Sequence, residues 1–369
     1  MEELPENIQR TLMNIIEDLK PRESVRSIGL FGSWSRGDAT PSSDVDLLVV
    51  DGRNLSYEYV ERAEIDNVFL DLNYIPEKWI LQEFPPEIDQ KIYESKTLYD
   101  PDGTLERAKN TMQKIMWLPE RVEIRTSSYI VKADTLLSRG LSAYGREDYQ
   151  SAKLNATLGL EIAMRIVMDV TKTPFSNSHF IRALEGSINK LDLREFYDCY
   201  LEVTGLSNIN RRNADAIFKA FKEVWSVITD FVEANSSTAK NLHEKILSNL
   251  NFYCKRSFLR GIITRTESLL QDNHVEASHY MLKSSASMLE NFAWLLAEIE
   301  GIQFDYTRLI GYLKSSKISP KKVYDDAVEI LMIKDVSLQD AQAALEKSRE
   351  TILKIRDIRR ELIAKMSTE

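Results

Sequence analysis

The chain has 369 residues, of which 43% are hydrophobic and 28% are charged, and its formal net charge is −9. These values are ordinary for a globular protein and leave room for two or three domains. No apolar run reaches the roughly 18 residues of a membrane-spanning helix, so no membrane association is expected. The acidic balance argues against a broad nucleic-acid-binding surface, because such a surface needs clustered Lys and Arg.

The chain begins with the acidic sequence MEELPE. A secretory signal begins with basic residues and then turns apolar, so we expect this protein to stay in the cytoplasm. The two cysteines, Cys199 and Cys254, lie far apart in helix-like sequence. We therefore expect buried free thiols rather than a disulfide.

The first part of the chain alternates helix and strand patterns. Apolar residues at helical spacing predict a helix from Glu6 to Leu19, which Pro21 ends. Two apolar runs predict strands over Ser24 to Phe31 and Val45 to Val50.

The next segments are less regular. Glu58 to Ala63 is expected to form a short helix, and Val68 to Ile75 a third strand. Lys96 to Gly103 resembles a short fourth strand that ends in a turn. Thr104 is then expected to cap a helix from Leu105 to Met116.

From Glu120 onward, helical apolar stripes replace strand alternation, which predicts an all-α region of helical bundles. A weak internal repeat is visible at an offset of 129 residues. It aligns Glu161 with Glu290, Phe175 with Phe304, and Ile181 with Ile310. Chance similarity of two amphipathic helices explains these matches equally well, so the repeat is left open.

The strongest chemical signal lies between the first two strands. Gly32 and Ser33 form a tight turn, and backbone N–H groups in such a turn can hold an anion such as phosphate. Asp44 and Asp46 open the second strand two residues apart, so their side chains share one face. Paired carboxylates suit Mg²⁺, which also binds substrate phosphates. The combination predicts metal-assisted phosphoryl or nucleotidyl transfer.

The segments GSWSRG, residues 32–37, and SDVDLLV, residues 43–49, carry a family resemblance. Together they resemble the signature of the DNA-polymerase-β-type nucleotidyltransferase superfamily, in its minimal and aminoglycoside-type branches. Ser35 stands where that pattern usually has Ala, a small-for-small difference. The resemblance implies an α+β fold, with a mixed-sheet nucleotidyltransferase domain at residues 1–118, two bound Mg²⁺ ions, and ATP or another NTP as substrate.

A third carboxylate is expected on a later strand. Asp71 stands in the middle of the apolar run from Val68 to Ile75, where a charge is costly unless it is paired or metal-bound. The resembled superfamily carries its third metal ligand on such a strand, which assigns Asp71 to this position. Asp66 is the competing candidate, but beside Asn67 it fits a turn residue better.

Two further residues flank the motif. Arg36 could neutralise a triphosphate, or it could form a structural ion pair, for instance with Asp38. These two interpretations are equally supported. Ser43 belongs to the nucleotide-binding signature, but we expect it to fix the loop rather than to contact nucleotide.

The helical part, divided as residues 119–250 and 251–369, resembles the HEPN-type bundles that accompany minimal nucleotidyltransferases. The ribonuclease motif of such bundles, Arg and His separated by four residues, is absent. In aminoglycoside-type relatives a helical-domain carboxylate can activate the acceptor hydroxyl, and Glu161 or Glu290 could do so here. Arg165 four residues after Glu161 favours a plain helix ion pair instead.

The sequence thus predicts an enzyme that transfers a nucleoside monophosphate to an acceptor hydroxyl and releases pyrophosphate. The acceptor is left open between a small hydroxylated cation and a protein; nucleic acid is disfavoured, and oligomerisation is undecided. The alternative is a regulatory module that binds nucleotide without turnover. Retention of the whole carboxylate set argues against that alternative.

Overall fold

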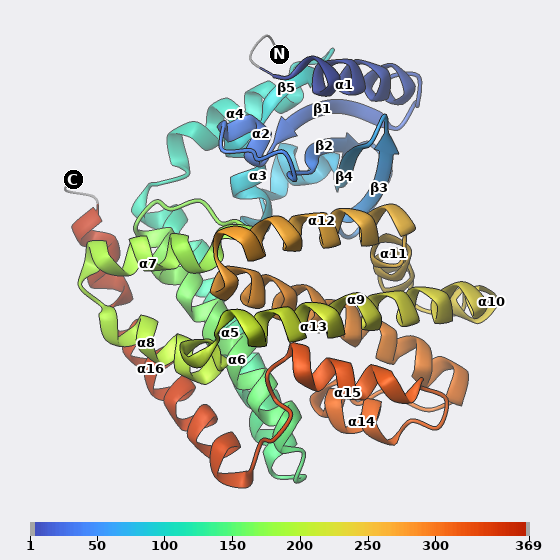
Figure 1. Cartoon of the computed structure of the whole chain (residues 1–369). Coiled ribbons are helices and arrows are strands. Elements are labelled where there is room, and N and C mark those ends of the chain that lie inside the picture. Colours follow the sequence, from blue (N-terminus) through green and yellow to red (C-terminus); the bar gives the residue numbers. More distant parts are fainter. Residues whose placement is uncertain (1–3, 367–369) are drawn as a thin grey trace. The chain divides into compact units, whose positions relative to one another are not determined.

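The computed structural model describes residues 4–366 and groups the chain into two compact units (Figure 1). The first unit contains residues 1–118 and 243–265, and the second contains residues 119–242 and 266–369. The predicted α+β class, a mixed sheet followed by a large helical region, is confirmed. The predicted division at residue 250 falls inside a helix of the first unit, so the contacts group the helical sequence differently from two consecutive bundles.

The sheet of the first unit has five strands in the order β3-β4-β2-β1-β5. β2 and β4 run parallel, and the other neighbouring strands are antiparallel. The strands are β1 (Val25–Phe31), β2 (Val45–Asp51), β3 (Tyr59–Ile65), β4 (Val68–Pro76) and β5 (Lys96–Tyr99).

Two local predictions are wrong. The segment from Glu58 to Ala63 is not a helix but contains the start of β3, which forms a hairpin with β4. The hairpin turn is Asp66-Asn67, both with positive φ, a conformation that Asn and Asp tolerate in tight hairpins. Thr104 does not cap the helix that follows it, because the Asp100 carboxylate accepts the free backbone N–H groups of Thr104 and Glu106 instead.

The two faces of the sheet are covered by different helices. α1 (Glu6–Leu19) buries its apolar side against the face that carries Val45, Leu47 and Val49. The opposite face carries Leu48 and Val50 and packs against α3 (Asp89–Glu94) and α4 (Thr104–Ile115). Because side chains alternate along a strand, Asp46 belongs to this second face.

The chain from residue 119 onward is helical, and the order of its helices repeats. The 3₁₀ turns Asn177–His179 and Tyr306–Arg308 lie 129 residues apart, and the helix after each begins at the next residue. The first set comprises α5 (Pro119–Tyr144), α6 (Tyr149–Val170), α7 (Phe180–Leu191), α8 (Arg194–Thr204) and α9 (Arg211–Ala234). The second set comprises α12 (Arg256–Asp272), α13 (His274–Glu300), α14 (Leu309–Ser315), α15 (Lys321–Ile330) and α16 (Leu338–Met366). The structure therefore supports the internal repeat that the sequence left open. The short helices α10 (Ser236–Ala239) and α11 (Glu244–Tyr253) connect the sets.

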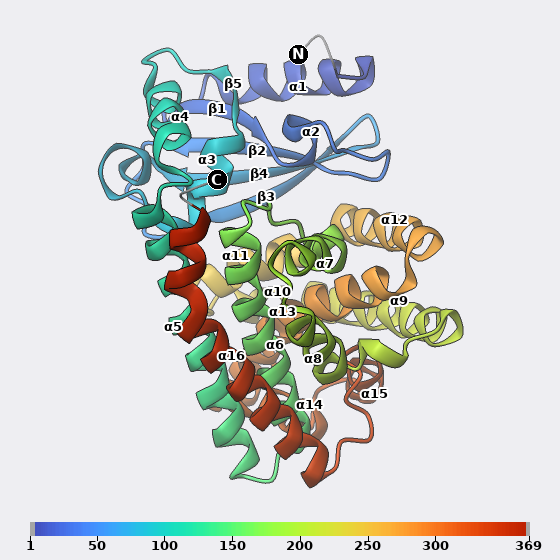
Figure 2. The ribbon, with the colours of Figure 1, turned by 90° about the vertical axis from the view of Figure 1, so that its left-hand side faces the viewer.

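The last helix of each set packs against the other set. α16 lies along α5 and α6, as Figure 2 shows, and α9 lies along α13 and α15. Helix capping is exchanged in the same way. The buried Glu276 carboxylate on α13 accepts the N–H groups of Ile181 and Arg182 at the start of α7, both at 2.9 Å. At the start of α14, the N–H of Gly311 donates to Asp148 at 3.0 Å.

Glu276→Ala is expected to destabilise the second unit by about 2–4 kcal/mol, because it leaves one buried and one partly buried N–H donor of α7 without an acceptor. Urea unfolding of the whole chain measures this loss. The control is Asp272→Ala, which removes an exposed carboxylate paired with Arg182 and should cost under about 1 kcal/mol. Equal losses in the two variants would contradict the role given to Glu276.

Cys199 and Cys254 are free thiols, as predicted, with Cys254 buried and Cys199 half-buried. Within residues 4–366, no helix combines the length and apolar character needed to cross a membrane.

Candidate functional site

The three predicted aspartates come together at the centre of the sheet. Asp44 directly precedes β2, and Asp46 is the second residue of that strand. Asp71 on β4 is the register partner of Asp46 in the parallel pair, so their side chains project from the same face as neighbours. Asp44, two residues before Asp46, faces the same way and is buried. The structure therefore places three carboxylates side by side.

Gly32 is required by the close approach of Asp46. Its φ is +73°, which only glycine adopts easily, and a Cβ at this position would lie 2.5 Å from Asp46 Oδ2. The predicted Gly-Ser turn is in fact the start of the four-residue helix α2 (Ser33–Arg36), with Gly32 as its N-cap. The Gly32 backbone thus lies directly against the carboxylate cluster, with Ser33 next to it.

Arg62 on β3 joins two of the carboxylates, and the sequence analysis missed it. Its guanidinium donates to Asp71 Oδ1 at 2.7 Å and to Asp44 Oδ1 at 3.0 Å, and its side chain is only 1% exposed. Arg62 is the register partner of Asp71 in the β3–β4 hairpin. The mistaken helix prediction over this segment concealed that pairing.

A second arginine reaches the cluster from a distant part of the chain. Helices α11 and α12 contribute residues 243–265 to the first unit, and Arg265 at the end of this segment pairs with Asp44 Oδ2 at 2.8 Å. On α12, the ring of Phe258 lies 5.5 Å from the guanidinium of Arg62, and the ring of Phe69 on β4 lies 4.9 Å from it. No sequence signal connects this helical segment to the sheet.

Burial and mutual repulsion raise two of the three carboxyl pKa values. Burial raises the pKa of Asp46 to about 7, with Asp71 and then Asp44 adding to the effect. Burial also raises the pKa of Asp71 to about 6, although Arg62 opposes the rise. The carboxylate of Asp46 accepts no hydrogen bond from any of residues 4–366. It is therefore the carboxylate that gains most from a cation.

Whether this donor set fits Mg²⁺ depends on the arginines. Oxygen ligands are the right chemistry, and Asp46 is available. However, no group of three His, Cys, Asp or Glu side chains in the described residues is arranged to hold a metal, since Arg62 bridges Asp44 and Asp71. The carboxylate of Asp46 thus fits a cation, whereas both oxygens of Asp44 already contact arginines. The two-ion site of the sequence analysis stays a prediction.

The other motif residues have structural partners. Arg36 pairs with Glu94 at 2.7 Å and with Asp38 at 3.1 Å. These contacts favour a structural ion pair over neutralisation of a triphosphate. The hydroxyl of Ser43 accepts the N–H of Thr40 at 2.9 Å and so closes the loop before β2.

The two candidate acceptor bases belong to the second unit. Burial disfavours the ionised form of Glu161, but Lys283 and Arg165 outweigh it and hold the pKa at about 2. So strong an acid is a poor proton acceptor near neutral pH, which argues against Glu161 as a base. Glu290 is half-buried on α13.

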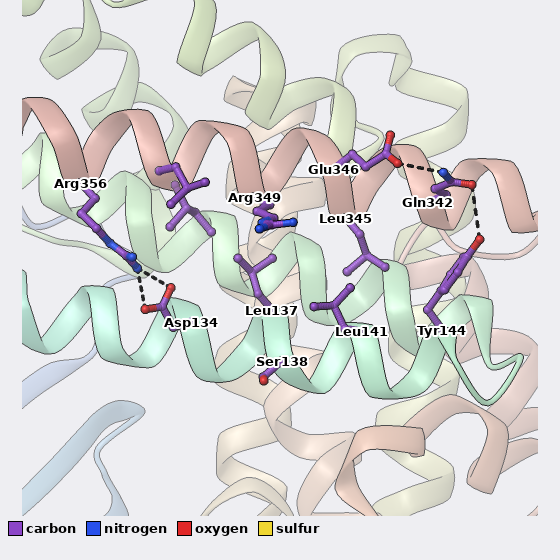
Figure 3. A pocket seen from close by; sticks show the side chains of 12 residues that line it. Asp134, Leu137, Ser138, Leu141, Tyr144, Gln342, Leu345, Glu346, Arg349 and Arg356 are labelled. Atoms are coloured by element: carbon purple, nitrogen blue, oxygen red, sulfur yellow. Dashed lines mark hydrogen bonds and ion pairs between the residues drawn. The ribbon is translucent and has the colours of Figure 1, made fainter.

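A pocket of about 540 Å³ lies between α5 and α16 in the second unit (Figure 3). Its middle is apolar and includes Leu137, Leu141 and Leu345. The Asp134–Arg356 ion pair closes one end, and the contacts from Tyr144 through Gln342 to Glu346 close the other. Helix α5 belongs to the first set of helices and α16 to the second, so this pocket lies where the two sets pack against each other.

Part of the chain is similar to known proteins. Residues 12–122 match a family model described as a nucleotidyltransferase domain. A 44-residue stretch is 48% identical to the protein adenylyltransferase MntA of Thermococcus cleftensis, covering 12% of this chain and 44% of that protein's length. A crystal structure of a nucleotidyltransferase-like protein from Exiguobacterium sibiricum aligns at 14% identity and a TM-score of 0.32, over 75% of this chain and 79% of that one.

Proposed function

We propose that this protein is a nucleotidyltransferase that moves a nucleoside monophosphate, AMP from ATP, onto an acceptor hydroxyl. The observation that carries the proposal is the convergence of Asp44, Asp46 and Asp71 on one sheet face against the backbone of Gly32. The family match over residues 12–122 supports transfer of a nucleotidyl group, and the partial resemblance to a protein adenylyltransferase favours AMP.

In the proposed reaction the acceptor oxygen forms a bond to the α-phosphorus while the bond to the β-phosphate oxygen breaks, so pyrophosphate leaves. A bound divalent cation would supply Lewis-acid stabilisation of the phosphate charge. Asp46 would hold that cation, next to Asp44 and Asp71. The Gly32 backbone lies directly against Asp46, so the backbone N–H groups of the Gly32–Ser33 segment would contact phosphate oxygens next to the bound cation.

Asp71 is the proposed proton acceptor for the attacking hydroxyl. Its pKa, raised to about 6, leaves it mostly ionised near neutral pH and still basic enough to take a proton. Its pairing with Arg62 fixes the direction of the carboxylate. The acceptor is a small hydroxylated cation or a protein, and the helical repeats, which we propose are HEPN-like, would shape its binding.

The experiment compares ATP labelled at the α-phosphate with ATP labelled at the γ-phosphate, in the presence of Mg²⁺ and of aminoglycosides or cell proteins as acceptors. Transfer of the α-label but not of the γ-label, with release of pyrophosphate, is expected. Transfer of the γ-label would identify a kinase and overturn the proposal.

A nucleotide-binding module without turnover is the second candidate. The position of Arg62 between Asp44 and Asp71 favours it, because an arginine there already neutralises part of the site. Tight binding of a non-hydrolysable ATP analogue, with no label transferred to any acceptor, would support this second candidate.

A further inference from the structure

Helix α12 occupies the place of α5 in the second repeat, yet its residues up to Arg265, and Lys255 before it, belong to the first unit. Lys255 donates to the carbonyl of Arg62 at 2.8 Å, Arg260 pairs with Glu64, and Arg265 pairs with Asp44. The repeat offset of 129 residues provides an internal comparison. At the corresponding first-copy positions the chain has Thr126, Val131 and Leu136, none of them charged.

These three positive charges therefore occur only in the second copy, in the segment 243–265 that belongs to the first unit. A helix that served the bundle alone would have no need of them, as α5 shows. Of the three, only Arg265 reaches the carboxylate cluster. This specialisation points to a role for Arg265 at the site itself.

Arg62 and Arg265 bind the cluster in different ways. The side chain of Arg62 is 1% exposed, lies near two aromatic rings and bridges two carboxylates. The side chain of Arg265 is 20% exposed, and its contacts with the carbonyl of Ser42 are long, at 3.3 and 3.4 Å. Because its side chain is partly exposed, Arg265 can leave Asp44 for solvent without stranding a buried charge, whereas Arg62 cannot.

We propose that Arg265 is a resident cation of the nucleotide site, which holds Asp44 until a divalent cation takes that carboxylate and then binds the phosphates of the nucleotide. This inference rests on the proposed function of the site. Arg265 contacts Asp44 Oδ2 at 2.8 Å, and Arg62 contacts the same oxygen at 2.9 Å. A divalent cation bound by Asp44 would compete with Arg265 for this carboxylate. Once displaced, the guanidinium lies beside the incoming triphosphate, whose oxygens match its planar donors.

Removal of Arg265 should therefore change the affinities for metal and nucleotide in opposite directions. Arg265→Gln is expected to bind Mn²⁺ alone about threefold more tightly, because a competing ion pair is gone. The same variant is expected to bind α,β-methylene-ATP with Mn²⁺ about tenfold more weakly, because a charge-assisted phosphate contact is lost. Electron paramagnetic resonance of free Mn²⁺ measures the first affinity, and calorimetry the second.

Arg260→Gln is the matched control, since it removes one positive charge from the same helix and its partner is Glu64 rather than an aspartate of the cluster. It should leave both affinities at the wild-type values. If Arg265→Gln equals Arg260→Gln in either affinity, the inference is overturned. If the wild-type protein binds neither Mn²⁺ nor the analogue, the proposed function fails together with it, which is a different result from failure of the inference alone.

Discussion

Asp46→Asn is expected to lower the rate of nucleotidyl transfer by about 1,000-fold or more, because it removes the carboxylate that is available to a cation. The amide keeps the size and shape of the side chain, so the contact with Gly32 and the fold are retained. Release of pyrophosphate from ATP, measured with the acceptor present, gives the rate. Pyrophosphate release at the wild-type rate would show that Asp46 has no part in the reaction.

The same variant should be the more stable protein at high pH when metal is absent. The pKa of Asp46 is raised from 3.8 to about 7, so folding favours its protonated form. The wild-type protein therefore loses stability as the pH rises from about 4 through 7, whereas an Asn at this position does not titrate. Thermal unfolding in EDTA at pH 5 and pH 8 checks this. A gain at pH 5 as large as that at pH 8 would contradict the assignment.

The part of the site that the sequence reveals is the part made by local chain. Gly32, Asp44 and Asp46 belong to one strand–loop–strand segment, and period-two alternation alone places the two aspartates on one face. Asp71 follows from a charge in an apolar strand, and parallel pairing with β2 brings it beside Asp46. These expectations needed no knowledge of distant contacts.

Local sequence patterns do not place Arg62 or Arg265 at the site. Arg62 lies on an edge strand whose charged residues hide the strand pattern, so only the Asp66-Asn67 turn signals the hairpin. Arg265 lies on a helix whose apolar periodicity is shared with every other helix of the repeat. Periodicity identifies a helix but does not say which unit it packs against.

The internal repeat also becomes clear only from the structure. Residue matches at the offset of 129 are too few to separate common origin from chance, whereas helix boundaries recur at that offset and the capping contacts recur to within one residue of it. Helices α9 and α16 each pack against the other set of helices, and no local sequence pattern encodes this packing. The sequence therefore predicted the helices but not their partners.

Arg62→Met is expected to destabilise the protein by about 3–5 kcal/mol in EDTA, because it leaves two buried carboxylates without their common partner. Asp44 and Asp71 both pair with this guanidinium, at 2.9 and 2.7 Å, and Met replaces its length but not its charge. Urea unfolding measures the loss.

Arg260→Met provides the comparison, since it breaks an ion pair whose arginine is 59% exposed and should cost under about 1 kcal/mol. Mn²⁺ at millimolar concentration should restore part of the stability that Arg62→Met loses, because a cation can then occupy the space between the two carboxylates. Arg260→Met, which leaves the cluster intact, should gain no more from Mn²⁺ than the wild-type protein does. If Arg62→Met lost no more stability than Arg260→Met, the bridge would be a surface-like contact, and the carboxylates would not depend on Arg62 for their placement.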